Sequence, residues 1–328
     1  MKSVLLIMPF FNSYHTIIKD EIENMGYKVK VVRDSSVFVK LTHLRFLSER
    51  IYDFYMNTIW PILFKLRTKG EYDYLFVIKG QELTPALCDY LQNGCKTKNS
   101  ILYLWDSIAH NPKATKILDY FKHCYTFDDA DSNKGVYKLE HIPLFYANLF
   151  NAVEQEEAGN IKYDFICIGS FKEERAYFLE QLENEYKNGG YSFLFKLYLP
   201  WNQYLRKILT SPGFFSRYRK YIFVRKMSLT SVATLTKQSR IVVDIPDKIQ
   251  SGLTMRTFEA LGARKKLLTT NMNIWSYSFF FSGNIATNIN EVDDLFINSD
   301  YTELDSESSR DLRSVTEWVS LMMSKLTS

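Results

Sequence analysis

Short apolar runs alternate with amphipathic segments along the first half of the chain. Runs of a few apolar residues that end at a polar residue or a glycine are typical of strands buried on both faces. We predict such strands at 4–8, 28–32, 72–78, 101–105 and 125–127. Helical spacing predicts helices at 16–25, stopped by Gly26, and at 84–92, capped by Thr84. A longer amphipathic segment, rich in aromatic residues, runs from 41 to 65.

The second half of the chain repeats this alternation after a polar interval. Residues 147–162 are acidic and lack an apolar period, which predicts a linker. A strand at 164–170 and a helix at 173–186 follow, and a further helix lies between apolar runs at 240–244 and 265–269. Strands that alternate with helices predict an α/β fold with parallel, doubly wound sheets. We place one domain at 1–150, a second at 151–310 and a final amphipathic helix within 311–328.

The bulk composition excludes several classes of protein. A chain of 328 residues is long enough for two domains, and 46% hydrophobic with 24% charged residues excludes a disordered protein. A net charge of +4 is too small to indicate nucleic-acid binding, which we do not expect. No apolar run reaches the ~18 residues of a membrane span. The chain start matches a buried strand better than an export signal, so we expect a cytoplasmic protein.

The four cysteines, Cys88, Cys95, Cys124 and Cys167, show no CxxC spacing. They are typical of buried, reduced thiols and do not indicate a disulfide framework or a zinc site.

The segment 201–227 is basic and aromatic. It holds seven cations, seven aromatic residues and no Asp or Glu. Such a surface suits an anionic membrane interface or a lipid-phosphate acceptor, and predicts peripheral contact with the inner face of the cell membrane. A solvated basic face over buried aromatic residues remains the alternative.

The chemistry is concentrated between the apolar runs at 240–244 and 265–269, in Ser-Gly-Leu-Thr-Met-Arg-Thr-Phe-Glu from 251 to 259. A loop that opens a helix at the carboxyl edge of a parallel sheet is where α/β proteins bind ligands. Gly252 permits close approach of the backbone, and the N–H groups of the helix start attract phosphate. Arg256 and Glu259 share one helix face, which predicts a nucleotide-sugar site. The alternative to a ligand site is structural: Arg256 and Glu259 would form a solvated ion pair, and the apolar residues of the same helix would face the core.

The chain resembles GT-B glycosyltransferases of the CgeB-like and lipopolysaccharide-biosynthesis type. The matching segments, in chain order, are 76–80, 103–106, 127–128 through 142–146, 163–170 and 251–262. The resemblance implies two Rossmann-like domains facing a cleft, with the acceptor on the N-terminal domain and the donor on the C-terminal one. It also implies that the final helix packs back on the N-terminal domain. The product would be a growing surface polysaccharide, such as lipopolysaccharide or capsule, or a lipid-linked glycan.

The resemblance also assigns donor contacts. Glu259 would bind the donor ribose and Arg256 the diphosphate. Gly169 and Ser170 would line the donor, Lys172 or Arg175 would add positive charge, and the loop Ser251, Gly252, Leu253 and Thr254 would hold phosphate. Such a site stabilises the leaving diphosphate by cations and a helix dipole, so we expect neither metal nor cofactor. Many retaining enzymes of this group carry a second Glu where this chain has Ser251, which puts a retaining mechanism in doubt.

An inverting transfer needs a general base near the acceptor hydroxyl. Asp106 follows a predicted strand of the first domain, and His110 comes one turn later. His15, in the loop after the first strand, is the rival candidate.

Other functions remain open. Asp129 and Asp131 have the DxD form that binds a divalent cation in GT-A transferases, although this stretch also suits a helix N-terminus. A non-catalytic two-lobed binding protein and an epimerase are the remaining alternatives.

Overall fold

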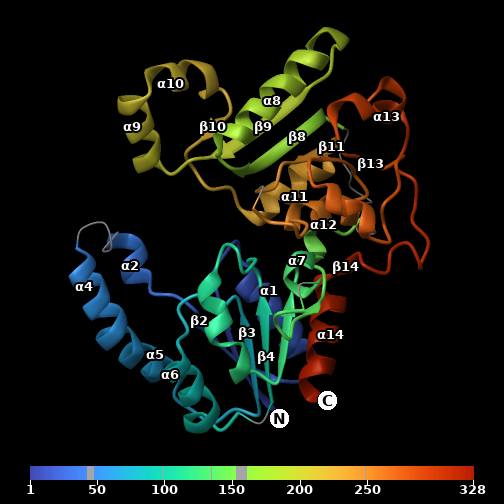
Figure 1. The fold of residues 1–328 in the computed structure, drawn as a ribbon. Coiled ribbons are helices and arrows are strands. Elements are labelled where there is room, and N and C mark those ends of the chain that lie inside the picture. Colours follow the sequence, from blue (N-terminus) through green and yellow to red (C-terminus); the bar gives the residue numbers. More distant parts are fainter. Residues whose placement is uncertain (43–47, 98, 134, 153–160, 248) are drawn as a thin grey trace. The chain divides into compact units, whose positions relative to one another are not determined.

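The computed structural model describes residues 1–42, 48–97, 99–133, 135–152, 161–247 and 249–328, which form two compact units. Unit 1 consists of Met1–Leu144, Lys248–Gly252 and Val315–Ser328, and unit 2 of Phe145–Asp247 and Leu253–Ser314. Each unit contains a six-stranded parallel sheet and its helices (Figure 1). The α/β class and the two Rossmann-like units are confirmed. The predicted linker falls largely on 153–160, outside the described residues.

The sheet of unit 1 has the order β2-β1-β3-β4-β5-β6. Its strands are β1 (Ser3–Met8), β2 (Lys28–Arg33), β3 (Tyr74–Ile78), β4 (Asn99–Leu104), β5 (His123–Thr126) and β6 (Glu140–His141). The strand order reverses direction between β1 and β3, and the carboxyl ends at such a point form the usual ligand crevice of an open α/β sheet. All five strands predicted for this half of the chain are present, with ends shifted by one or two residues.

The helices of unit 1 connect these strands. They are α1 (Tyr14–Asn24), α2 (Val37–Thr42), α4 (Glu49–Phe54), η1 (Tyr55–Ile59), α5 (Trp60–Thr68), α6 (Pro85–Asp89), η2 (Tyr90–Gly94), η3 (Pro112–Lys116), η4 (Leu118–Tyr120), α7 (Asp129–Asn133) and α14 (Val315–Thr327). Thr84 caps α6 through its side chain, which accepts from the Leu87 N–H, as its position predicted. The predicted segment 41–65 includes 43–47, which lie outside the described residues.

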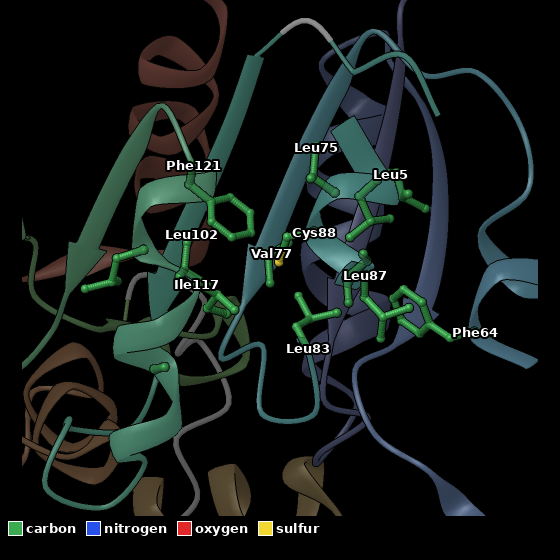
Figure 2. Packing of buried hydrophobic residues seen from close by; sticks show 14 of the residues in the cluster. Leu5, Phe64, Leu75, Val77, Leu83, Leu87, Cys88, Leu102, Ile117 and Phe121 are labelled. Carbon is green, nitrogen blue, oxygen red and sulfur yellow. The ribbon is translucent and has the colours of Figure 1, made fainter. Parts of the chain in front are cut away.

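One face of the unit 1 sheet packs against α6 and the turns beside it (Figure 2). The strands contribute every second residue, including Leu5, Leu75, Val77 and Leu102, because successive side chains of a strand point to opposite faces. Leu87 and Cys88 of α6 meet them from the helix side. All four cysteines of the chain are buried and free, as predicted.

The opposite face of this sheet is covered by the last helix of the chain. Trp318 of α14 is fully buried and stacks on Phe76 of β3, with a ring-centroid distance of 6.0 Å. It meets Tyr103 of β4 edge-on at 4.9 Å. The C-terminal residues therefore complete the core of the unit that contains the N-terminus.

Residues Glu49–Thr68 form one continuous helix through α4, the π turn η1 and α5. In the π turn the Trp60 N–H donates to the Tyr55 carbonyl, five residues back. Tyr55, Trp60, Phe64 and Thr68 are buried on its inner face. The outer face carries exposed apolar side chains instead.

The sheet of unit 2 has the order β10-β9-β8-β11-β12-β13. Its strands are β8 (Tyr163–Ser170), β9 (Phe193–Tyr198), β10 (Ile222–Phe223), β11 (Ser239–Asp244), β12 (Lys266–Thr269) and β13 (Ile285–Ala286). When these six strands are numbered 1 to 6 along the chain, their order in the sheet is 3-2-1-4-5-6, which is the dinucleotide-binding arrangement. The strand order reverses direction between β8 and β11, and we call this place the switch point of unit 2. A separate pair joins β7 (Phe145–Tyr146) to β14 (Arg313–Ser314).

The helices of unit 2 include the two that were predicted, α8 (Glu173–Tyr186) and α12 (Met255–Gly262). The others are η5 (Asn148–Phe150), η6 (Lys187–Gly189), α9 (Trp201–Thr210), α10 (Pro212–Tyr218), α11 (Leu229–Lys237), η7 (Met272–Ser276), η8 (Ile289–Glu291) and α13 (Asp294–Asn298). Because α12 connects β11 to β12, its first turn lies at the carboxyl edge of the sheet, beside the switch point.

Candidate functional site

A buried carboxylate organises the carboxyl edge of the unit 2 sheet. Asp244 is the last residue of β11 and is 1% exposed. It accepts hydrogen bonds from the hydroxyls of Thr254 (2.6 Å) and Thr257 (2.9 Å), and Arg256 Nη1 lies 2.9 Å away. A buried charge is stable when it is paired and hydrogen-bonded in this way. Sequence reasoning missed Asp244 and Thr257 as site residues, although a charged residue that ends an apolar strand was a usable signal.

Thr254 is the N-cap residue of α12 and also binds the helix start to the end of β11. Its side chain accepts from the Arg256 N–H at 3.1 Å, which caps the helix, while its hydroxyl donates to Asp244. The helix start is therefore held at the end of β11 by the same side chain that satisfies its backbone.

Arg256 lies over the end of the neighbouring strand β8. A Cβ atom at Gly169 would come within 2.6 Å of Arg256 Nη2, so the glycine makes room for the guanidinium. Burial lowers the pKa of Arg256, but the charge and hydrogen bond of Asp244, together with the charges of Cys167 and Glu259, outweigh this effect and the net pKa is raised. The ion pair thus holds a charged guanidinium at the switch point.

A second guanidinium lies beside the first. Arg175 of α8 donates to the Ile245 carbonyl through Nε (3.0 Å) and Nη2 (2.6 Å), and to both the carbonyl and the hydroxyl of Ser170. Burial, and then the charge of Arg256, lowers its pKa below the ordinary value. Arginine nevertheless stays protonated in proteins. Two guanidinium groups and the Asp244 carboxylate leave one net positive charge at the strand ends.

Glu259 follows Arg256 on the same face of α12. It is half-buried and lines a cavity of about 10 Å³ with Arg256, Ile166 and Val232 among others. A space of this size holds no more than one water molecule. The cavity beside Glu259 is therefore too small to hold a ribose.

Three of the residues predicted as cationic or loop contacts have partners within their own units. Lys172 forms an ion pair with Asp247. The N–H groups of Ser251 and Gly252, which belong to unit 1, donate to the Asp128 carboxylate at 2.9 and 3.1 Å. Leu253 is 1% exposed and serves the core.

Gly252 is required by contact with the chain's own backbone. A Cβ atom there would lie 2.6 Å from the Phe127 carbonyl oxygen and 2.7 Å from its ring. The close approach that the sequence assigned to a ligand is thus made, in this structure, to Phe127.

The candidate bases lie at the carboxyl edge of the unit 1 sheet. Asp106 follows β4 and pairs with Lys79 Nζ at 2.7 Å. Lys79 adopts the left-handed backbone conformation, with φ of 72°. His110 Nδ1 lies 3.0 Å from the Ser107 hydroxyl.

His15 is placed in the first turn of α1 and stacks on Phe10, with ring centroids 4.1 Å apart. Its Nδ1 atom is buried and has no hydrogen-bond partner among the described residues. Burial, together with the charge of Arg33, lowers the pKa of His15 below 6.5. The imidazole is therefore neutral at pH 7.

The DxD residues make other interactions. Asp129 lies 3.0 Å from His141 Nε2, and Asp131 is 3% exposed and accepts from the Ile108 N–H at 2.7 Å. Asp128 accepts from the Ala130 N–H at 3.0 Å at the start of α7, so the stretch does form a helix N-terminus. Within the described ranges, no group of three or more His, Cys, Asp or Glu residues is placed to hold a metal ion.

The basic segment 201–227 is less open than its sequence indicates. Arg217 and Lys220 pair with Glu180 and Glu183 of α8, each at 2.6 Å, and Lys207 pairs with Glu173. Acidic residues of the preceding helix therefore neutralise part of the predicted basic surface. The exposed apolar residues of α9 are Trp201, Leu205 and Leu209. No helix in the described part of the chain is both long and apolar enough to span a bilayer.

Comparison with known proteins identifies the fold. No protein-family model and no curated protein matches the chain in sequence. An alpha-glucosyltransferase in complex with UDP and a mismatched 13-mer DNA aligns over 100% of both chains with a TM-score of 0.59 and 10% identity. HepE from Anabaena, in complex with UDP and glucose, aligns over 100% of both chains with a TM-score of 0.56 and 11% identity. The fold is GT-B.

The GT-B fold also occurs in an enzyme of a different activity. UDP-GlcNAc 2-epimerase from Neisseria meningitidis, bound to UDP-GlcNAc, covers 99% of both chains with a TM-score of 0.55 and 11% identity. At identities of 10–11%, these matches establish the GT-B fold of this chain and leave its reaction to the residues of the site.

Proposed function

We propose that this GT-B protein is a glycosyltransferase that moves a sugar from a nucleoside diphosphate to a glycan acceptor. The observation that carries the proposal is the cationic switch point of unit 2. Arg256 and Arg175 meet there at the end of β8, and Asp244 holds Arg256 in place. A fixed positive charge at the carboxyl edge of a parallel sheet stabilises a diphosphate leaving group without reorganisation.

We propose the following donor contacts on the basis of this geometry. Arg256 binds the diphosphate, and Glu259, one turn further along α12, accepts hydrogen bonds from the ribose hydroxyls. Arg175 is a positioning residue, because its bonds fix the ends of β8 and β11. Ser170 is exposed at the strand end and is free of the core, so its hydroxyl lines the donor. Since Ser251 and Gly252 donate to Asp128, phosphate binding falls to the first turn of α12.

We assign the general base to His15. A base must be unprotonated at the working pH, and burial keeps this imidazole neutral. Asp106 is the alternative, and its ion pair with Lys79 suits a positioning role.

The acceptor is a growing surface polysaccharide, such as lipopolysaccharide or capsule, or a lipid-linked glycan, as in CgeB-like transferases. The exposed Trp201, Leu205 and Leu209 of α9 lie on one helix face and support contact with the inner face of the cell membrane.

The first test is thermal unfolding of the full chain against a panel of nucleoside diphosphates and nucleotide sugars, with and without a chelator. A ligand at ~100 times its dissociation constant stabilises by about 2.7 kcal/mol, a shift of a few degrees. We expect a shift with one nucleoside diphosphate that persists in chelator. Glu259→Ala should weaken binding by roughly 10- to 100-fold, as expected for losing hydrogen bonds to a charged acceptor. Glu185→Ala, an exposed glutamate of α8, is the matched control.

Each other outcome redirects the proposal. A shift that needs a divalent cation would favour a metal-dependent transferase that uses Asp129 and Asp131. Conversion of the nucleotide sugar without an acceptor would indicate an epimerase. Absence of any shift would indicate a binding protein for another ligand.

A further inference from the structure

The outer face of the helix Glu49–Thr68 is apolar. Five large apolar side chains on it are between 37% and 66% exposed, and we call this set the outer stripe: Ile51, Phe54, Ile59, Ile62 and Leu66. Opposite them, Tyr55, Trp60 and Phe64 are buried in the core of unit 1. A helix that is apolar on both sides is typical of one that is covered on both sides. Single exposed apolar residues need no explanation, but a contiguous patch does.

The π turn keeps the outer stripe on one face. Phe54 and Ile59 are five residues apart, and in a regular α-helix this spacing would place them about 140° apart. A π turn closes an i→i+5 hydrogen bond and brings such a pair into line. The same turn aligns Tyr55 with Trp60 on the inner face, where both are buried. Both faces are therefore continuous along the whole helix.

The outer stripe is nearly symmetric about its centre. Its spacings along the chain are 3, 5, 3 and 4 residues, so reversing the helix about Ile59 brings Ile51 opposite position 67, one residue beyond Leu66, and Phe54 opposite position 64, two residues beyond Ile62. The charges beside the stripe reverse as well. Asp53 and Lys65 are both exposed, at equal distances in sequence from Ile59. An antiparallel second copy would place each one opposite the other.

The charges at these positions are available for such a contact. Neither Asp53 nor Lys65 forms an ion pair with another described residue, and the Lys65 ammonium lies 5.2 Å from the Tyr90 ring centroid. Glu49 and Arg50 in the first turn carry opposite charges and cancel. Charge complementarity under reversal favours a two-fold contact, because an isologous interface pairs residue i with j and j with i.

We propose that the outer stripe is a self-association surface, which pairs with the same helix of a second copy in an antiparallel two-fold contact. The five side chains expose on the order of 500 Å² per copy, so the pair would bury about 1,000 Å², the lower limit of a specific interface. The contact is thus a reversible dimer. Burial of the apolar stripe drives association, and the Asp53–Lys65 pairs select the antiparallel direction.

The test is sedimentation equilibrium of the full chain over a range of concentrations. We expect a monomer–dimer equilibrium that Ile62→Glu shifts by at least 100-fold toward monomer, because each dimer would then bury two unpaired carboxylates. Leu295→Glu, at an exposed leucine of α13, is the matched control and should leave the dimer unchanged. Ile62 is exposed, so its replacement should not alter the melting curve of the monomer.

A charge swap tests the antiparallel direction separately. Asp53→Lys and Lys65→Asp should each weaken the dimer about tenfold, since two exposed pairs per dimer turn repulsive. The double variant should recover most of the loss. A wild-type chain that stays monomeric, a dimer insensitive to Ile62→Glu, or a swap without recovery would each overturn the proposal. A monomer that binds anionic vesicles through Ile62 would also overturn it in favour of a membrane surface. Donor-induced stabilisation is measured independently, so failure of this proposal and of the proposed function are distinguishable.

Discussion

At the scale of single residues, the candidate site depends on one carboxylate that was not predicted from the sequence. Asp244 binds the two hydroxyls and the guanidinium that define the start of α12. Removing one member of a buried ion pair is strongly destabilising, because the remaining charge is left without compensation. Asp244 therefore positions Arg256, and the space that Arg256 occupies is set by the absent side chain of Gly169.

The base assignment predicts a specific pH dependence. The pKa of His15 in the folded chain lies below 6.5, so the folded state binds fewer protons than the unfolded one. Its contribution to stability is constant above pH 6.5 and decreases as the pH falls toward the folded pKa. For the same reason, kcat/KM should fall on the acid side with an apparent pKa below 6.5.

His15→Gln should lower turnover by roughly 10²- to 10⁴-fold, the usual contribution of a general base, and should remove this acid limb. Donor affinity should stay within about twofold, because His15 and the donor contacts belong to different units. His110→Gln is the matched control, since His110 bonds Ser107 and should leave the profile intact. Persistence of the limb in His15→Gln with its loss in Asp106→Asn would transfer the role to Asp106.

At the scale of elements, two amphipathic helices expose their apolar sides for different physical reasons. The helix Glu49–Thr68 has a second apolar face because its π turn aligns two sets of side chains. In α9 no residue is buried, and its apolar residues are left at the surface while nearby cations bind α8. The basic character of 201–227 therefore serves partly to hold α9 and α10 against the acidic side of α8.

The proposed membrane contact of α9 depends on its apolar side chains. Replacing both Trp201 and Leu209 by serine should reduce partition onto anionic vesicles by more than tenfold, because each buried side chain of this size contributes about 1.5–3 kcal/mol. Vesicle sedimentation measures this, and Leu295→Ser on α13 is the control for a general loss of surface apolarity. Equal partition of the double variant and the wild type would remove α9 from the interface.

At the scale of the whole molecule, the chain order and the structural units do not coincide. Unit 1 begins at Met1 and is completed by Val315–Ser328 from the other end of the chain. Trp318 covers Phe76 and Tyr103, both of which are fully buried in the complete structure.

Residues 1–144 alone should therefore fail to form a native core. We expect this fragment to bind a hydrophobic dye, to lose near-ultraviolet circular dichroism and to unfold without cooperativity, as partly packed states do. In the full chain, Trp318→Ala should have a smaller effect than this truncation. It should lower the free energy of unfolding by about 3–5 kcal/mol, as is typical of removing a buried tryptophan. Urea titrations of both, beside the wild type, provide the comparison. Cooperative unfolding of the isolated fragment would contradict this view of α14.

The sequence alone determined the features that depend on local patterns. Apolar runs that end in polar residues located β1 to β5, β8, β11 and β12 but missed β9 and the two-residue strands, and helical spacing located α1, α8, α12 and α14. Burial on both faces or on one face dictates these patterns. The parallel α/β class followed from their alternation. The sequence also predicted that the loop before α12 is a candidate ligand site. A glycine and a helix start at a strand end are local features that a sequence records.

The tertiary structure decided which side chains are free and which are already bound. Lys172, Arg217 and Lys220 looked like available cations, but acidic residues far away in sequence pair with them. The N–H groups of Ser251 and Gly252 donate to Asp128, more than a hundred positions away. Such contacts depend on distance in space, and a sequence pattern records only neighbours along the chain. For the same reason, only the fold could show that Asp244 binds Arg256 and that Trp318 completes the first unit.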